Sequence, residues 1–290
     1  DSFLSLKPKI EIILNIDSDH LDYFKDIDHI VSSFDKFAHL VPGSGTIIAY
    51  DANPFVNQVI RDLDNVVTFG LSENCDYYAA NIKFNEDGMP SFDVCHDGKL
   101  LSRVQLAVPG EHNILNALAG FTCACVLGVE PALTKKTLEA YHGTQRRFDL
   151  VGTTARGVKI VDDYAHHPTE IKATLSASEN VPHNKLWCIF QAHTYTRTIA
   201  LFDEFADAFE KADHLILAEI YAAREKNIYK ISSAQLVEKI KETHPDKDVL
   251  FMEDFAAIAD YVDSQAQRGD MVITMGAGDI YKVGEMLLEK

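Results

Sequence analysis

The second half of the chain alternates between short runs rich in β-branched residues and amphipathic segments with helical spacing. The runs cover 158–162, 185–190, 213–218, 248–252 and 270–275, and the helical segments cover 169–179, 198–211, 232–242, 254–267 and 279–289. This alternation predicts right-handed βαβ units and a mostly parallel, doubly wound, Rossmann-like sheet. In such open sheets, ligands bind beyond the carboxyl ends of the strands.

The first half of the chain shows a different strand pattern. Strands are expected at 10–16, 46–50 and 66–69, and helices at 27–40, 111–127 and 131–141. Between 76 and 108, short alternating segments surround Asp87-Gly88 and Asp97-Gly98. This pattern predicts an antiparallel meander, because Asp-Gly favours tight hairpin turns. We therefore expect two α/β domains, at 1–147 and at 148–290.

The composition excludes several classes of protein. With 290 residues, 47% apolar and 24% charged, the chain is typical of globular proteins. A net charge of −17 argues against nucleic-acid partners, which require Lys and Arg to displace counterions. No apolar run approaches the roughly 18 residues that span a bilayer, so no membrane partner is expected. The five cysteines lack metal-ligand spacing, which favours reduced thiols in a cytoplasmic protein.

Acidic residues and one imidazole follow the strand expected at 10–16. Asp17, Asp19, His20 and Asp22 lie within six residues of one another. Carboxylate oxygens suit Mg²⁺, and histidine is a less usual ligand for this ion. The alternative is a loop in which an aspartate caps a helix.

A pair of amides marks the start of the helix expected at 111–127. Asn113 and Asn116 are three residues apart, so both side chains can face the same side of a helix. They could read the edge of a heteroaromatic base, with His112 packed against its face. The alternative is that Asn113 caps the helix, which requires no ligand.

The remaining clusters lie near the domain junction and at expected strand ends. Arg146 and Arg147 could bind phosphate through their guanidinium groups or form an interdomain salt bridge. Arg197 is expected near a helix N-terminus, where a cation is unfavourable, so an anionic substrate or a carboxylate from a neighbouring loop should accompany it. Gly276 and Gly278 could cradle an anion or could only permit a tight turn.

The segment that follows the strand at 158–162 favours a functional interpretation. It contains two acids, a phenol and two imidazoles, and packing alone does not explain a group that is so costly to desolvate. Its titratable residues are Asp162, Asp163, Tyr164, His166 and His167.

Five motifs occur in one order along the chain: NIDSDHLDYF, GEHNILNALAG, RRFD, DDYAHHPTEI and FQAHTYTRT. Together they resemble the Mur ligases, and within that family the members that join L-alanine to UDP-N-acetylmuramate. The resemblance extends from about Phe3 to Met286. It implies a partial central ATPase domain with the antiparallel meander at 1–147 and a C-terminal Rossmann-like domain at 148–290. Because the resemblance covers only the later part of the central domain and the C-terminal domain, the UDP-binding domain of the family is expected to be missing. The P-loop is expected to be missing as well, since no G-x-x-x-x-G-K-[ST] occurs.

The resemblance also implies roles for individual residues. Ala192 and Thr194 depart from residues found in the family, which leaves Arg197 as the one guanidinium of its motif. The implied roles are a Mg²⁺ ligand for His20, an adenine pocket of His112, Asn113 and Asn116, an ATP phosphate contact for Arg147, a ribose contact for Asp163, and a catalytic amino-acid and muramyl carboxylate site around Tyr164, His166 and Arg197.

The implied reaction is ATP-dependent amide formation in peptidoglycan precursor synthesis. The carboxylate of UDP-N-acetylmuramate would attack ATP to give an acyl phosphate, which the amine of L-alanine would then displace. His166 is hypothesised to orient this amine or to accept its proton. Three alternatives remain: a ligase that attaches a recycled tripeptide to UDP-N-acetylmuramate, a metal-dependent phosphoesterase, and an inert nucleotide-binding fragment. We expect the isolated chain to fold but to have little ligase activity.

Overall fold

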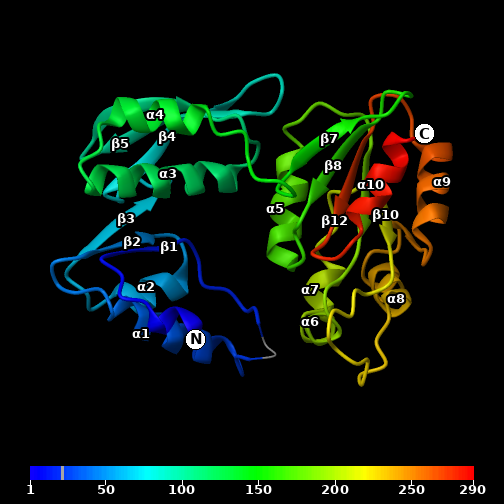
Figure 1. Cartoon of the computed structure of the whole chain (residues 1–290), viewed down its shortest axis with the longest axis horizontal. Coiled ribbons are helices and arrows are strands. Elements are labelled where there is room, and N and C mark those ends of the chain that lie inside the picture. Colours follow the sequence, from blue (N-terminus) through cyan, green and yellow to red (C-terminus); the bar gives the residue numbers. More distant parts are fainter. Residues whose placement is uncertain (21–22) are drawn as a thin grey trace. The chain divides into compact units, whose positions relative to one another are not determined.

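The computed structural model describes residues 1–20 and 23–290, and it divides into two compact units, 1–142 and 143–290 (Figure 1). No helix among the described residues combines the length and the apolar character that crossing a membrane requires. Each unit contains its own mixed β-sheet with helices on both faces.

The first unit is built on a six-stranded sheet with the order β1-β2-β3-β4-β5-β6. Neighbouring strands are parallel from β1 to β4 and antiparallel from β4 to β6, so the expected meander is confirmed. The strands are β1 (Ile10–Ile13), β2 (Thr46–Tyr50), β3 (Val66–Gly70), β4 (Tyr77–Phe84), β5 (Pro90–His96) and β6 (Lys99–Gln105).

Helices lie on both sides of this sheet (Figure 1). One hydrophobic cluster joins Ile13 and Ile47 to α1 and α2, and the other joins Ile48 and Phe69 to α3. The single turn η1 precedes β1, and α4 packs against β6. The bounds are η1 (Ser2–Ser5), α1 (Ile27–Ala38), α2 (Pro54–Ile60), α3 (Glu111–Val126) and α4 (Pro131–Glu139).

One ionisable side chain of β1 is buried on the sheet face that α1 and α2 cover. Glu11 is 3% exposed and pairs in register with Ile47. Neither of its carboxylate oxygens has a hydrogen-bond partner among the described residues. Burial raises the pKa of Glu11 to about 7, because the charged form loses its hydration without a compensating donor.

The second unit contains a sheet with the order β11-β10-β9-β12-β8-β7. Its first five members are parallel, which confirms the expected doubly wound sheet, and β7 runs antiparallel to β8 at one edge. The strands are β7 (Asp149–Thr153), β8 (Lys159–Asp163), β9 (Leu186–Phe190), β10 (His214–Leu217), β11 (Asp248–Phe251) and β12 (Met271–Met275).

Helices also cover both faces of the second sheet (Figure 1). The rings of Phe205 and Phe209 contact Phe190 on one face, while α9 and α10 join Ile189 in a hydrophobic cluster on the other. The expected helix at 198–211 is wrong in detail: two short helices flank Leu201, whose φ of −118° and ψ of 32° interrupt the helical path. The bounds are α5 (Pro168–Ser178), α6 (Tyr195–Ala200), α7 (Phe202–Ala206), α8 (Ser233–Thr243), α9 (Phe255–Gln265) and α10 (Tyr281–Leu288).

Candidate functional site

The carboxyl end of β8 carries two buried acids that organise the chain around it. Asp163 Oδ2 accepts the Phe148 N–H at 2.8 Å, and its Oδ1 accepts the Ala165 N–H at 2.7 Å. Burial raises the pKa of Asp163, while these hydrogen bonds oppose the rise. Asp162 accepts from Thr274 Oγ1 at 2.8 Å. Both acids therefore fix neighbouring segments, and Asp163 holds backbone groups on both sides of the strand end.

The two adjacent arginines occupy different environments within the second unit. The Arg146 guanidinium lies 4.9 Å from the ring centroids of Tyr164 and Tyr281. Its Nε donates to Asp162 Oδ2 at 2.9 Å, and its Nη2 donates to the Gly276 carbonyl at 2.7 Å. These partners belong to the same structural unit as Arg146, so these bonds of Arg146 lie within the second unit. Its bonds and ring contacts instead hold the start of this unit against the ends of β8 and β12.

Arg147 is the more accessible of the pair. Its side chain is 54% exposed, and its guanidinium lies 5.5 Å from the Tyr164 ring. Arg147 Nη1 lies 3.7 Å from the carboxylate oxygen Glu170 Oε1. Since a half-exposed guanidinium can still donate several hydrogen bonds, Arg147 is suited to bind an anion such as phosphate.

Two imidazoles and a phenol gather beyond the ends of β8 and β9. The ring centroids of Tyr164 and His166 are 5.5 Å apart, and those of His166 and His193 are 5.9 Å apart. His193 stacks on Tyr221 at 5.5 Å. Burial is the main cause that lowers the pKa of His193, and the neighbouring His166 and Arg197 lower it further. The geometry therefore brings together Tyr164, His166 and the segment that carries Arg197, as expected for strand ends of one sheet.

Arg197 lies on α6, and the carboxylate of Glu225 from a neighbouring loop binds the residues that begin this helix. Arg197 Nη1 donates to the His193 carbonyl at 2.6 Å. Glu225 accepts from Thr194 Oγ1 at 2.5 Å and from the Thr196 N–H at 2.9 Å. Burial would raise the pKa of Glu225, but these hydrogen bonds lower it overall. A protein carboxylate thus lies at this helix start, as one of the two alternatives predicted, and binding of an anionic substrate by Arg197 stays a prediction.

The glycines at the end of β12 permit close packing. A Cβ at Gly276 would lie 2.5 Å from the Gln191 carbonyl oxygen, and one at Gly278 would lie 2.4 Å from Gln191 Oε1. The Asp279 N–H also donates to Gln191 Oε1, at 3.1 Å. Because Gln191 already occupies this turn, the structure favours the tight-turn interpretation over an anion cradle.

In the first unit, the expected amide pair lies at the start of α3. Asn113 Nδ2 donates to the Pro109 carbonyl at 2.7 Å, and Asn116 Nδ2 donates to Asn113 Oδ1 at 3.2 Å. The N-cap residue is Gly110, with a φ of 97° that favours glycine, and no side chain caps the helix. The capping alternative for Asn113 is therefore wrong. His112 is half-buried beside this pair.

The expected metal ligand His20 lies on an exposed loop after β1. Its side chain is 68% exposed, and its Nε2 lies 3.8 Å from Asp19 Oδ2. Asp22 lies outside the described residues. Among the residues that are described, no three His, Cys, Asp or Glu side chains form a group that could hold a metal ion. His20 would therefore need ligands from elsewhere, such as nucleotide phosphates.

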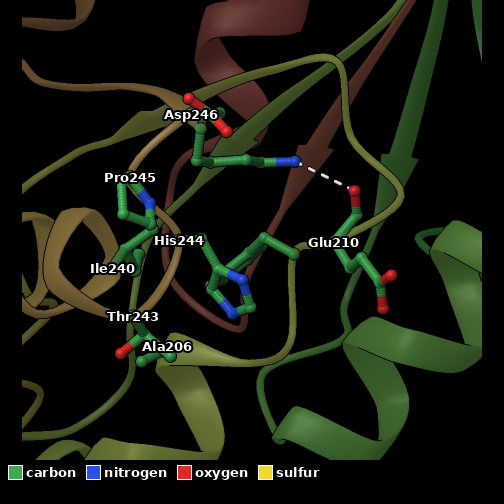
Figure 2. Close-up of a pocket in the computed structure, with 9 residues that line it drawn as sticks. Ala206, Glu210, Ile240, Thr243, His244, Pro245 and Asp246 are labelled. Atoms are coloured by element: carbon green, nitrogen blue, oxygen red, sulfur yellow. Dashed lines mark hydrogen bonds between the residues drawn. The ribbon is translucent and has the colours of Figure 1, made fainter.

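A separate cavity of about 380 Å³ is lined by residues that precede β10 and β11 (Figure 2). It therefore lies at the amino ends of these parallel strands, whereas the candidate site lies at the carboxyl ends. Lys247 Nζ donates to the Glu210 carbonyl at 3.0 Å and also to the Ala212 carbonyl. His244 Nε2 lies 2.8 Å from Asp207 Oδ1. The polar groups that line this cavity thus bind other groups of the protein, so the candidate site is the one at the carboxyl ends of the strands.

Two family models match the chain in succession. The Mur ligase middle domain matches residues 2–124, and the Mur ligase glutamate ligase domain matches residues 146–278. The chain belongs to the Mur ligase family. The middle-domain match lies within the first structural unit, and the glutamate ligase domain match lies within the second.

Individual Mur ligases, known from their sequences or from solved structures, are also similar to this chain. The chain is 47% identical to UDP-N-acetylmuramate–L-alanine ligases of Alkaliphilus metalliredigens and Caldanaerobacter subterraneus, covering 99% and 100% of this chain and 62% and 63% of those proteins. The crystal structure of UDP-N-acetylmuramate-alanine ligase MurC from Thermotoga maritima matches with a TM-score of 0.78 and 25% identity, over 99% of this chain and 60% of that one. The chain thus spans about three fifths of the length of these relatives.

Two contact residues of this candidate site were not predicted from the sequence. Glu170 and Glu225 hold the segments that carry His166 and Arg197. Glu170 follows His167 by three residues, and this spacing is the signature of a capping box. That local signal could have identified Glu170, whereas Glu225 lies 31 positions from Thr194 and leaves no local pattern.

Proposed function

We propose that this chain provides the middle and C-terminal domains of an ATP-dependent ligase that joins L-alanine to the carboxylate of UDP-N-acetylmuramate. Two relatives that carry this name are 47% identical over nearly the whole chain, and this observation supports the proposal most directly. The clustering of Tyr164, His166 and Arg197 beyond β8 and β9 adds chemical support, because it offers imidazole, phenol and guanidinium groups at the edge where such sheets bind ligands.

The proposed reaction forms an acyl phosphate and then an amide. The substrate carboxylate attacks the γ-phosphorus of ATP, ADP leaves, and the amine of L-alanine displaces phosphate from the acyl carbon. Arg147 would stabilise charge on the transferred phosphoryl group, and Arg197 would bind a carboxylate. Asn113 and Asn116, with His112, would hold the adenine, and Asp163 would contact the ribose. An ADP complex of MurF from Thermotoga maritima, 19% identical with a TM-score of 0.72, has the same fold and fits the use of ATP.

His166 would act on the amine that attacks the acyl phosphate. A protonated ammonium has no lone pair, so the amine must lose a proton before or during attack. A neutral imidazole at the strand end can accept that proton or orient the amine. Tyr164 lies beside this ring and would line the same carboxylate site.

We also propose that Mg²⁺ accompanies ATP and that His20 contributes one ligand to it. The donor set fits this ion only when phosphate oxygens complete it, because Mg²⁺ is usually bound by one or two protein groups together with substrate phosphates. When bound, the ion neutralises charge on the phosphates. The five free cysteines are consistent with the reducing cytoplasm, where we place the reaction.

Ligation is tested in a full-length ligase that contains this chain. We expect ADP release that requires both UDP-N-acetylmuramate and L-alanine, with His166→Ala lowering turnover far more than the affinity for ATP. A preference for a tripeptide over L-alanine would support the recycling ligase, and phosphate release without an amine acceptor would support a phosphoesterase. Strong ligase activity of the isolated 290-residue chain would contradict our expectation that it is inactive alone.

A further inference from the structure

Glu170 is placed at the start of α5, directly after the segment that carries the candidate catalytic side chains. Its Oε2 accepts the N–H groups of His166 at 3.0 Å and His167 at 3.2 Å. In return, His167 Nδ1 accepts the Thr169 N–H at 3.3 Å, which completes a capping box. Glu170 therefore fixes the backbone of the 166–167 segment onto the helix.

The same carboxylate lies close to two side chains that the proposed reaction uses. Glu170 Oε2 is 3.3 Å from His166 Nδ1, and Glu170 Oε1 is 3.7 Å from Arg147 Nη1. Capping alone requires only one acceptor oxygen near the helix N–H groups. The second oxygen instead faces a guanidinium, so one negative charge lies between an imidazole and the accessible arginine.

The surroundings of His166 Nδ1 determine which ring nitrogen carries the proton. Nδ1 lies 3.0 Å from the Tyr164 carbonyl oxygen and 3.3 Å from the Glu170 carboxylate. Both neighbours are acceptors, so a neutral His166 is most stable with its proton on Nδ1 and with Nε2 as the accepting atom. A carbonyl alone would favour this tautomer, and the adjacent negative charge strengthens the preference.

We propose that Glu170 is a positioning residue that holds neutral His166 in the Nδ1–H tautomer and keeps Arg147 beside Tyr164. The mechanistic meaning of this role rests on the proposed ligase function, whereas the tautomer itself does not. Nε2 is then the atom that accepts the proton of the amine, and Glu170 couples that atom to the arginine proposed to contact phosphate. The side chain of Glu170 is 37% exposed, so its ion pairs contribute little to stability and its effect is mainly on orientation.

Substitution of Glu170 separates its charge from its capping role. Glu170→Gln keeps an oxygen that can accept the two backbone N–H groups but removes the negative charge, while Glu170→Ala removes both. Gln235 offers a matched control, because it occupies the same position in the capping box of α8, which is also an 11-residue helix of the second unit. Gln235→Ala removes a capping side chain at a helix that carries none of the candidate site residues.

The tautomer is measured on the 290-residue chain by ¹⁵N NMR of the histidine rings above the pH at which they are charged. We expect the Nδ1–H tautomer of His166 to dominate in the wild type. In Glu170→Gln, the ratio of Nδ1–H to Nε2–H should fall about tenfold, the order expected when a neutral amide replaces a carboxylate beside an N–H. Gln235→Ala should leave the His166 signals unchanged.

Stability and ligation complete the test. Glu170→Gln should unfold at nearly the wild-type urea concentration when followed by Trp187 fluorescence, while Glu170→Ala unfolds earlier. In a full-length ligase, Glu170→Gln should lower kcat with Gln235→Ala unaffected. Unchanged His166 ring signals in Glu170→Gln, or a loss of stability equal to that of Glu170→Ala, would overturn the proposal. Failure of the wild-type enzyme to ligate would instead refute the proposed function, and the NMR result would stand by itself.

Discussion

Substitution of the buried acid Glu11 should stabilise the first unit, and the size of the effect should depend on pH. Burial without a hydrogen-bond donor raises the pKa of Glu11 from 4.5 to about 7. Each tenfold change in proton affinity corresponds to about 1.4 kcal/mol, so charging this carboxyl lowers the free energy of unfolding by about 3 kcal/mol. The folded pKa lies above the unfolded value, so stability is greatest below pH 4.5 and decreases as the pH rises to about 7.

Glu11→Gln keeps the shape of the side chain but cannot ionise. At pH 8 we expect the free energy of unfolding of Glu11→Gln to exceed that of the wild type by about 3 kcal/mol. At pH 5 this difference should fall below about 1 kcal/mol. The folded fraction of the first unit can be followed in urea through the methyl NMR signals of the buried Ile47 and Ile48. Glu86→Gln, at an exposed turn, provides the control.

The reasoning depends on the ionisation of a single carboxyl group. If wild type and Glu11→Gln show the same pH dependence between pH 5 and pH 8, Glu11 ionises normally and its burial carries no such cost. A direct measurement is the ¹³C titration of the Glu11 carboxyl carbon, which should have its midpoint near pH 7. A midpoint near 4.5 would show that burial does not raise the pKa of Glu11 and would contradict the prediction.

Three further predictions concern backbone space, stacking and fluorescence. Gly276→Ala should destabilise the second unit, because its Cβ would lie 2.5 Å from the Gln191 backbone carbonyl oxygen and its φ is 149°. Gly120→Ala, in open space on α3, should instead stabilise the first unit by up to about 1 kcal/mol, and urea unfolding measures both changes. Arg146→Lys should cost the second unit about 2 kcal/mol in urea unfolding, because it loses a fork-shaped donor and two ring contacts. Trp187, the one tryptophan of the chain, should report unfolding of the second unit alone, so its transition should be insensitive to Gly120→Ala.

Local patterns in the sequence were sufficient for most of the fold. The spacing of apolar runs predicted the five parallel strands of the second unit, and the Asp-Gly pairs predicted the meander of the first. The edge strand β7 was missed because Leu150 and Val151 are exposed, so it has no buried apolar face to recognise. The break at Leu201 was missed because the apolar stripe of the 198–211 segment continues across both short helices.

The candidate site was predicted in part, and the rest depends on contacts between distant segments. Arg146 and Arg147 are adjacent and chemically identical, and only the tertiary structure shows that one is held between two tyrosine rings while the other is accessible. The roles implied for Asp163 and His20 stay predictions. The burial of Glu11 was not foreseen, since a single acid in an apolar strand gives no sign of which sheet face it occupies.

The bond between Thr194 and Glu225 has a consequence for how this site can vary among related proteins. It joins the segment of Arg197 to the loop after β10, across 31 positions of the chain. A change at either position removes this side-chain bond, although Glu225 would still accept the Thr196 N–H, so substitutions at 194 and 225 should tend to be inherited together. An arginine at 194 could pair with the same carboxylate, so the positive charge that it adds to this corner of the protein would have a counterion already in place.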